Sequence, residues 1–316
     1  MAKKHKSIDF RKIKTVSLKE RKNKVKMENF AKVCSKGGGF KEFLDSLPKI
    51  LTGNDIRDVL NSIGRAYQTK KIILFSLGAH VIKCGLNPVI IDLIHKRVID
   101  GLALNGAGLI HDVEIALIGA TSENVNSGLA NGTFGMARET AELINKAVSE
   151  AGQKNKGIGE VVGDKLLTLK APNNSVSIVA QARALDIPIT IHPAIGTDIV
   201  HQHPGVDSQA WGKAGFSDFR LFIKLVSQLE GGVFINVGSA VIMPEVFLKA
   251  LTVARNLKFK VKKFTTVNMD QIEHYRSKMN IVKRPTELGG QGYYLIGRHE
   301  VMVPFLARAI KEELDL

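Results

Sequence analysis

Short apolar runs alternate with segments of helical periodicity along most of this chain. The expected strands are Ile72–Leu77, Leu102–Asn105, Ile187–Ile191, Val233–Val237, Lys262–Val267 and Tyr293–Ile296. The expected helices are Phe40–Leu51, Asp55–Tyr67, Pro88–Lys96, Asp112–Ile118, Ala137–Glu150, Ser175–Leu185, Asp218–Gln228, Pro244–Arg255 and Val301–Leu314. Strands that lack a polar face need helices on both sides. The pattern therefore predicts an α/β fold with a doubly wound, mostly parallel, Rossmann-like sheet.

One glycine-rich segment interrupts this alternation. Gly157–Gly163 lacks the GxGxxG spacing of a phosphate-binding turn, and no clear strand precedes it. We therefore expect a mobile surface loop at this segment. Outside it, we expect one α/β domain over residues 27–316, preceded by an N-terminal arm over residues 1–26.

The composition is that of a folded protein without a membrane span. Apolar residues make up 44% of the 316 residues. No uninterrupted apolar run approaches the roughly 18 residues that a membrane helix needs. The N-terminus has no apolar segment of the kind that directs secretion. The two cysteines, Cys34 and Cys84, form no CxxC pattern and fit a reducing compartment, so we expect a cytoplasmic protein.

Positive charge is concentrated at the N-terminus. The formal net charge is +15, and residues 1–26 hold eleven Lys and Arg against two acidic residues. A basic arm of this kind binds nucleic acid or an acidic protein electrostatically. The same arm is also compatible with a solvated segment or with packing on a neighbouring subunit. Phe10 is its only aromatic residue, so stacking on bases has little support.

Polar residues gather where the first two expected strands end. The segments are Gly78–Gly85 after the first strand and Asn105–Asp112 after the second. Parallel strands that turn into helices leave free backbone N–H groups at the carboxyl edge of a sheet, where phosphate-bearing ligands bind. His80 and Lys83 stand in the first segment and His111 in the second. Glycines alone would also serve a tight turn, but both of these turns carry ionisable neighbours.

Other polar turns are also candidates for ligand binding. Gly238-Ser239-Ala240 follows the fourth strand and precedes a helix. Thr121-Ser122-Glu123 and Asn131–Thr140 precede the Ala137 helix, whose N-terminus attracts anions. The Thr-Ser-Glu stretch is equally typical of a helix cap. Gly297–Glu300, after the last strand, completes the set.

Three histidines and an aspartate follow the third strand closely: His192, Asp198, His201 and His203. Neutral imidazole and carboxylate suit zinc or another first-row metal. Prolines and glycines in the segment hide its geometry, so substrate contact, acid–base chemistry and structural hydrogen bonding are alternatives. A metal-dependent hydrolase is therefore a second functional hypothesis. GxSxG, GxxxxGK[ST] and HExxH motifs are absent, which disfavours lipase-like, P-loop and zincin mechanisms.

The order of these elements resembles the deoxyhypusine synthase family over residues 70–310. The matching segments are Gly78–Gly85, Asn105–Asp112, Pro193–Asp198 and Asn236–Ser239. The resemblance implies an NAD-binding doubly wound fold, a homotetramer and transferase chemistry on an amine. The residues expected to bind the cofactor are Gly78, Ala79, Asn105, Gly106, Ala107, Gly108, Asp112, Asp198, Gly238 and Ser239.

The chain departs from that family at the residues that carry its catalysis. Ile296-Gly297-Arg298 stands where the family has the lysine that forms an imine with an aminobutyl group, and arginine cannot form that imine. Val241–Pro244 stands in place of the family's histidine. The acidic residues of the family's polyamine site are missing around Leu288–Gly292. We therefore expect a divergent branch that is not a true deoxyhypusine synthase.

The favoured function is an NAD-dependent enzyme that acts on a C–N bond of an amine or polyamine-like substrate. His80, His111 and His201 are the acid–base candidates, because histidine titrates near neutral pH. Lys83 is the candidate replacement for the missing lysine. The alternatives are the metal-dependent hydrolase and a non-catalytic binding protein on the same scaffold. The expected partners are a small amine and further copies of the chain.

Overall fold

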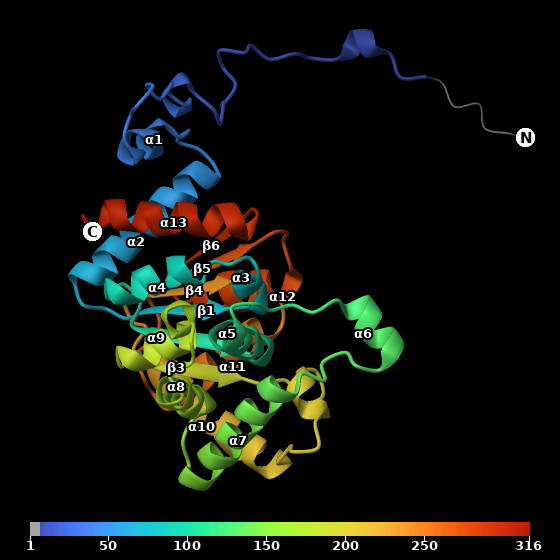
Figure 1. Cartoon of the computed structure of the whole chain (residues 1–316). Coiled ribbons are helices and arrows are strands. Elements are labelled where there is room, and N and C mark those ends of the chain that lie inside the picture. The colour runs from blue at the N-terminus through green and yellow to red at the C-terminus, as the bar shows by residue number, and fades with distance from the viewer. Residues whose placement is uncertain (1–6) are drawn as a thin grey trace, which may run out of the picture.

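The computed structural model describes residues 7–316, and its centre is one six-stranded sheet (Figure 1). The strands are β1 (Ile73–Leu77), β2 (Gly101–Asn105), β3 (Ile189–His192), β4 (Val233–Val237), β5 (Thr265–Asp270) and β6 (Gln291–Ile296). Their order is β3-β2-β1-β4-β5-β6, and every neighbouring pair is parallel. The order reverses between β1 and β4, so their carboxyl ends form the switch point where such sheets bind ligands. The predicted fold class is confirmed.

Helices connect the strands and begin close to the carboxyl edge of the sheet. The α-helices are α1 (Phe40–Ser46), α2 (Thr52–Gln68), α3 (Ala79–Lys83), α4 (Asn87–His95), α5 (Gly106–Ile118), α6 (Val125–Asn131), α7 (Arg138–Lys154), α8 (Ile158–Thr168), α9 (Ile178–Ala184), α10 (Ser208–Val226), α11 (Ile242–Asn256), α12 (Tyr275–Ser277) and α13 (His299–Glu313). α3 and α5 start at the residue or two after β1 and β2, and these two starts position the site described below.

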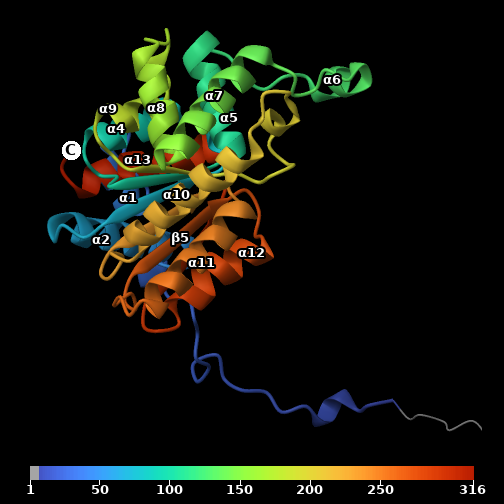
Figure 2. The same cartoon turned by 90° about the horizontal axis from the view of Figure 1, so that it is seen from below.

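Two helical layers enclose the sheet. Figure 2 shows α10, α11 and α12 on one face and α5, α8 and α9 on the other. Alternate residues of β1 enter different cores: Leu74 packs with Phe234, while Phe75 and Leu77 pack on the opposite face. Phe234 stacks on Phe247 of α11 with ring centroids 3.9 Å apart. This burial on both faces fixes the strands, and with them the positions of the strand ends.

The six predicted strands are present, with one shift along the chain. The fifth was predicted at Lys262–Val267, whereas β5 runs from Thr265 to Asp270. Lys262 and Lys263 are exposed, and the whole of β5 is buried between β4 and β6. The shift matters because it places Asp270 at the carboxyl edge of the sheet, opposite Ile296.

The predicted mobile loop at Gly157–Gly163 is wrong, because most of this segment lies in α8. A long-range contact stabilises the start of that helix. The buried Asp218 carboxylate of α10 accepts hydrogen bonds from the backbone N–H groups of Gly159 (3.2 Å) and Ile191 (3.0 Å). A side chain at Gly159 would overlap the Ile189 carbonyl oxygen, so glycine lets α8 approach β3 closely.

Two segments project from the packed body in Figure 1. One is the lobe that carries α6, between α5 and α7. The other is the N-terminal segment before α1, which contains short 3-10 turns at Phe10–Lys12 and Met27–Asn29. Within residues 7–316, we find no helix whose length and apolar character would let it span a membrane.

Candidate functional site

Four of the residues predicted to be catalytic or to bind the cofactor surround one cavity at the carboxyl edge of β1, β2 and β3. They are Lys83 of α3, Ala107 and His111 of α5, and Asp198. The cavity has a volume of about 170 Å³, and we call it the α5 pocket. Its other lining residues are Ile110, Glu114, Ser122, Glu123, Val125, Phe134, Thr197 and Ile199. The α6 lobe therefore forms one wall of the pocket, and the segment after β3 forms another.

The Asp198 carboxylate fills the N-terminus of α5. It lies against the Cα of Gly106, where any side chain would overlap it, and it accepts hydrogen bonds from the backbone N–H groups of Ala107 and of Ala194 (2.8 Å). The Asn105 side chain caps the same helix by accepting from Gly108 N at 2.9 Å. The first amides of α5 are thus bonded to protein oxygens, and a carboxylate stands where the sequence predicted a phosphate.

His111, Thr121 and Glu114 form a hydrogen-bonded chain beside the pocket. The Thr121 hydroxyl donates to Glu114, and His111 Nδ1 lies 2.6 Å from the same hydroxyl oxygen. Because a hydroxyl has one proton to donate, His111 must donate from Nδ1, which leaves Nε2 as the basic nitrogen. Burial raises the pKa of Glu114, but the hydrogen bonds from His111 and Thr121 outweigh burial and hold that pKa below its usual value.

The α5 pocket carries more negative than positive groups. Glu114, Glu123 and Asp198 line it, and Lys83 is the single lysine or arginine in its lining. Glu123 is held in place by the backbone N–H of Gly135, which donates to its carboxylate at 2.8 Å. Burial raises the pKa of Asp198, which makes a cationic partner favourable for its ionised form. The pocket therefore suits a small cation better than an anion.

The predicted glycine turns after β1 and β4 meet at the switch point. Gly78 N donates to Val237 O at 2.8 Å. A side chain at Gly78 would come within 2.9 Å of Ser239 N and would overlap the Gly238 carbonyl, so the close approach requires glycine. The Ser239 hydroxyl caps α11 by accepting from Met243 N at 3.2 Å.

A histidine and a carboxylate with unpaired polar atoms lie beside these glycines. His299, at the start of α13, is 1% exposed, and neither of its ring nitrogens has a hydrogen-bond partner. Its Nε2 lies 3.8 Å from Asp270 Oδ1, and Asp270 Oδ2, which has no hydrogen-bond partner, lies 3.8 Å from His274 Nε2. The His80 ring packs edge-on against His299 with centroids 5.3 Å apart, and Cys84 Sγ lies 3.4 Å from His80 Nε2. We call His80, Cys84, Asp270 and His299 the switch-point cluster.

Asp112, predicted to bind the cofactor, points away from the edge of the sheet. It is fully buried and accepts hydrogen bonds from Asn87, from the Ser177 hydroxyl and from the backbone N–H groups of Ile178 and Val179. Burial raises its pKa to about 6. These contacts place Asp112 at the N-terminus of α9, so its role in the described structure is to join α5 to α9.

The residues of the metal hypothesis face different partners. His192 is buried against Thr190 and Phe222, and burial lowers its pKa to about 3. His201 packs on Trp211 with ring centroids 4.5 Å apart and does not line the α5 pocket. His203 contacts the Gly135 carbonyl at 2.8 Å. Within residues 7–316, no three His, Cys, Asp or Glu side chains converge as metal ligands, so the hydrolase hypothesis lacks a geometric basis.

Sequence reasoning missed Glu114 and Asp270, and it gave His299 no role beyond its place in the candidate turn Gly297–Glu300. Glu114 follows His111 by three residues in α5, and that spacing puts both on one face of a helix. This signal was available. Asp270 was hidden because the predicted fifth strand ended before it. His299 becomes informative only through the unpaired ring nitrogens that packing leaves beside Gly238.

The comparisons with known proteins concern the fold. No family model and no curated protein matches the chain. An arginine dihydrolase, ArgZ, of the cyanobacterial ornithine–ammonia cycle is 12% identical, with a TM-score of 0.51 over 81% of this chain and 31% of its own. AgrE, solved as a ternary complex with ornithine and NAD+, is 13% identical, with a TM-score of 0.50 over 82% of this chain and 32% of its own. This chain thus spans about a third of the length of those two proteins.

A third neighbour matches over nearly its whole length. It is a proposed deoxyhypusine synthase from Entamoeba histolytica, 12% identical, with a TM-score of 0.51 over 86% of this chain and 93% of its own. The chain has a deoxyhypusine-synthase-like fold. The resemblance seen in the sequence is thereby confirmed at the level of architecture. Identities this low establish the deoxyhypusine-synthase-like fold and leave the activity to be argued from the site.

NAD is the cofactor that the resemblance implies; the unpaired atoms at the switch point are chemically compatible with a nucleotide, whereas the N-terminus of α5 is not. The unpaired atoms of His299 and Asp270 need hydrogen-bond partners, which the hydroxyls and amide of a nucleotide supply. The N-terminus of α5 is closed by Asp198, whose charge repels a phosphate. Of the predicted cofactor residues, Gly78, Ala79, Gly238 and Ser239 lie at the switch point, whereas Gly106, Ala107 and Gly108 lie at the N-terminus of α5 that Asp198 closes.

Proposed function

We propose that this protein is an NAD-dependent enzyme that acts on a C–N bond of a small amine or polyamine-like substrate. One observation carries the proposal. A pocket rich in carboxylates and a cluster of unpaired polar atoms lie at the same edge of the sheet, joined by the short helix α3. The first suits the ammonium group of a substrate, and the second suits a nucleotide.

The substrate binds in the α5 pocket in this proposal. Asp198 and Glu123 hold its ammonium group through charge-assisted hydrogen bonds, which are the stronger kind in a partly buried site. Phe134 and Ile199 contact the alkyl portion and exclude water. The modest volume of about 170 Å³ favours a short aliphatic amine over a larger ligand.

His111 moves the proton. Its Nε2 is the basic nitrogen in the tautomer that Thr121 and Glu114 impose, so it can accept a proton from a bound ammonium and return it later. Lys83 stands across the same pocket. It is the residue placed to form an imine with a carbonyl-type carbon, in place of the lysine that the related family uses.

The cofactor is held at the switch point. Gly78 and Gly238 pack closely together, with the His299 ring against Gly238, Ser239 lies beside them, and Asp270 and His299 supply the hydrogen-bonding groups. When bound, NAD supplies an acceptor for the hydride that leaves the carbon of a C–N bond. True deoxyhypusine synthesis is not part of the proposal, because Arg298 occupies the lysine's place in the resemblance. Arg298 is exposed and bonds to Gln271 at 2.5 Å.

The test combines binding with turnover. Isothermal titration with NAD, followed by absorbance of NADH, is run against linear diamines, polyamines and basic amino acids. The proposal expects NAD binding and an amine-dependent rise in NADH that Lys83→Met abolishes. Lys213→Met, at an exposed position of α10, is the matched control. Absence of NAD binding by the wild-type chain overturns the proposal and leaves the non-catalytic binding protein as the better reading.

A further inference from the structure

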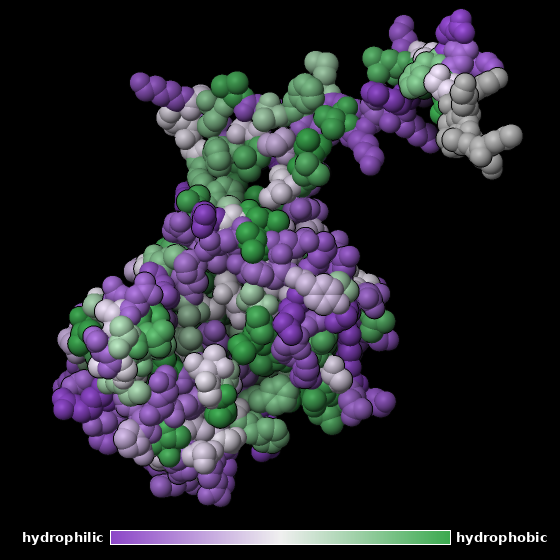
Figure 3. All heavy atoms as spheres, turned by 90° about the vertical axis from the view of Figure 1, so that its right-hand side faces the viewer, coloured by the Kyte–Doolittle hydropathy of each residue, from purple (hydrophilic) through white to green (hydrophobic). Residues whose placement is uncertain are grey.

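The N-terminal arm exposes apolar side chains that no other residue within 7–316 covers. Ile8, Phe10, Val16 and Leu18 are 83%, 77%, 77% and 67% exposed. Figure 3 shows hydrophobic residues interspersed with hydrophilic ones along this arm, which rises from the top of the body. Isolated exposed apolar residues are ordinary, but several on one extended segment that packs on nothing else indicate a surface that another surface covers.

The arm has few ties to the body that carries it. Hydrogen bonds made by residues 7–26 stay within residues 7–29, as between Asp9 and Arg11. The first bonds to the body come at Asn29 with Lys49 and at Lys32 with Ser46. In extended form residues 7–26 of the arm span up to about 70 Å. The arm is therefore anchored at its base and long enough to lie across a neighbouring molecule.

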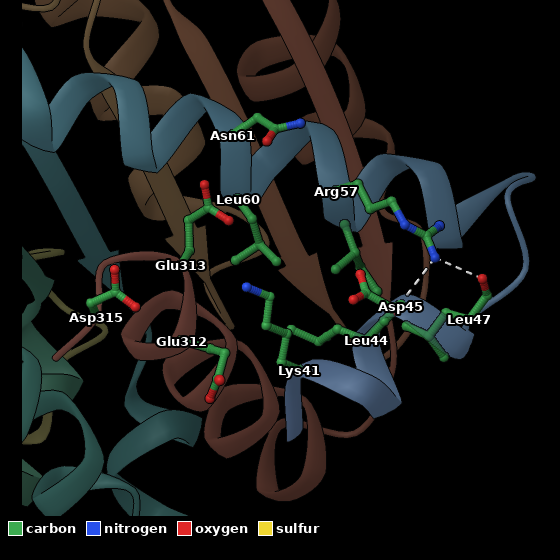
Figure 4. Close-up of a pocket in the computed structure, with 11 residues that line it drawn as sticks. Lys41, Leu44, Asp45, Leu47, Arg57, Leu60, Asn61, Glu312, Glu313 and Asp315 are labelled. Carbon is green, nitrogen blue, oxygen red and sulfur yellow. Dashed lines mark hydrogen bonds between the residues drawn. The ribbon is translucent and has the colours of Figure 1, made fainter. Parts of the chain in front are cut away.

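A complementary pocket lies at the base of the arm. It is formed by α1, α2 and the end of α13, and we call it the α13 pocket (Figure 4). Its volume is about 300 Å³. Leu44, Leu47, Ile56 and Leu60 provide an apolar floor, as an apolar side chain of the arm requires.

The rim of the α13 pocket is negative. Asp45, Glu312, Glu313 and Asp315 line it, against Lys41 and Arg57. The Arg57 guanidinium is already bonded to backbone carbonyls, including those of Leu44 (3.1 Å) and Leu47 (2.6 Å), as Figure 4 shows.

Three of these carboxylates have no ion pair. Within residues 7–316, only Glu312 has one, with Arg308 at 2.6 Å, whereas Asp45, Glu313 and Asp315 have none. Basic side chains that flank an apolar residue match this rim and floor. The arm offers that pattern at Phe10-Arg11-Lys12-Ile13-Lys14.

We propose that the arm of one chain docks in the α13 pocket of a second copy of this chain. The pocket lies at the root of the arm itself, so a two-fold axis near α1 carries each arm to the other chain's pocket. In such a dimer each arm is buried in the other chain's α13 pocket, so both arms and both pockets are occupied. The proposal is independent of the NAD chemistry, because neither the α5 pocket nor the switch-point cluster takes part in it.

Disulfide trapping between full-length chains tests the contact directly. Both native cysteines are replaced by serine. One chain then carries a single cysteine in the arm, at Phe10→Cys, Ile13→Cys or Leu18→Cys. A second chain carries Glu313→Cys or the control Glu287→Cys, which is exposed and lies outside the α13 pocket. Mixed chains are oxidised mildly and run on a non-reducing gel, where a disulfide between the two kinds of chain can only be intermolecular.

The expected result is at least tenfold more mixed dimer with Glu313→Cys than with Glu287→Cys, at one or more arm positions. Raising the salt concentration from about 0.1 M to about 1 M should lower the yield of mixed dimer, because the charged contacts are screened. Equal trapping at both positions, or none, overturns the proposal. So does trapping that appears only within a chain carrying both cysteines, which assigns the arm to its own body. Trapping that needs added RNA also overturns it.

Discussion

His80 and Lys83 stand one turn apart on α3, yet each faces a different part of the site. The His80 ring packs on His299 at 5.3 Å, in the switch-point cluster. Lys83 lines the α5 pocket with His111 and Asp198. A five-residue helix that leaves β1 directly after Gly78 thus connects the proposed cofactor side to the proposed substrate side.

Removing the charge of Asp198 tests whether the α5 pocket prefers a cationic ligand. We expect Asp198→Asn to weaken binding of a linear diamine by about tenfold or more, since a hydrogen bond to a charged group contributes about 1.5–3 kcal/mol. The amide still caps α5, so the fold is retained. Isothermal titration measures the change. Asp186→Asn, which removes one carboxylate charge at an exposed position outside both pockets, should leave diamine binding unaltered, and a loss there as well contradicts the prediction.

Reversing the direction of the Glu114 hydrogen bond tests the role of His111. In Glu114→Gln the amide oxygen accepts the hydrogen bond that Ser122 N–H makes to Glu114, which turns the amide nitrogen toward Thr121. The amide then donates to Thr121, Thr121 donates to His111 Nδ1, and the imidazole proton moves to Nε2. We expect turnover to fall by about a hundredfold, because the base is lost. Imidazole nitrogen chemical shifts of His111 detect the tautomer change separately from activity.

The control for that substitution is Glu139→Gln, whose carboxylate is exposed and paired with Arg138. It should change neither turnover nor the His111 shifts. An unchanged tautomer in Glu114→Gln would falsify the hydrogen-bonded chain even if activity falls.

The polar groups of the switch-point cluster are expected to bind the cofactor. Asp270→Asn removes a charged hydrogen-bond acceptor, and His299→Ala removes the imidazole nitrogens. Each substitution should therefore raise the dissociation constant for NAD by about tenfold. Fluorescence or calorimetric titration of NAD measures this without turnover. His95→Ala, at the exposed C-terminal residue of α4, is the comparison. If the wild type binds NAD and both variants bind it equally well, the cofactor does not contact this pair.

Gly78 packs so closely on Gly238 that a side chain at this position should destabilise the fold. Gly78→Ala forces backbone atoms apart, so we expect a loss of about 2–3 kcal/mol in the free energy of unfolding. Gly212→Ala lies in an open part of α10, where alanine favours the helix, and it should stabilise by up to about 1 kcal/mol. Chemical denaturation measures both. Equal and small effects would show that the two strand ends have room to separate.

Asp218 predicts a pH dependence of stability. Burial raises its pKa to about 7, from an ordinary value of 3.8. A carboxyl with a raised folded pKa binds protons more tightly in the folded state. The protonated carboxyl therefore stabilises the folded state at low pH, and this stabilisation is lost as the pH rises from about 4 to about 7.

Asp218→Asn should remove that loss. The amide oxygen still accepts from Gly159 and Ile191, and the amide nitrogen replaces the unpaired Oδ1. Across this window the free energy of unfolding of the variant should rise relative to that of the wild type by up to about 1.4 kcal/mol for each pH unit. Above the window this difference should become constant. Denaturation at pH values on both sides of the window tests it, and parallel curves for the two proteins count against the assignment.

Local pattern was sufficient for the architecture of this protein. Apolar β-branched runs between amphipathic helices predicted six parallel strands, because strands buried on both faces leave a periodic record in the chain. The segments after the first, second and third strands identified Lys83, His111 and Asp198 respectively, since the ends of parallel strands meet at one edge. The turn after the fourth strand identified Gly238 for the same reason.

Packing alone decided which of these residues share a site and what they can bind. Asp198 closes the N-terminus of α5, Asp112 turns into the core, and Asp218 builds a helix from a segment whose glycines suggested a loop. In each case a carboxylate reaches amides that are distant in sequence, so no local pattern records the bond. Asp270 and His299 likewise become neighbours only when β5 and α13 pack together at the switch point.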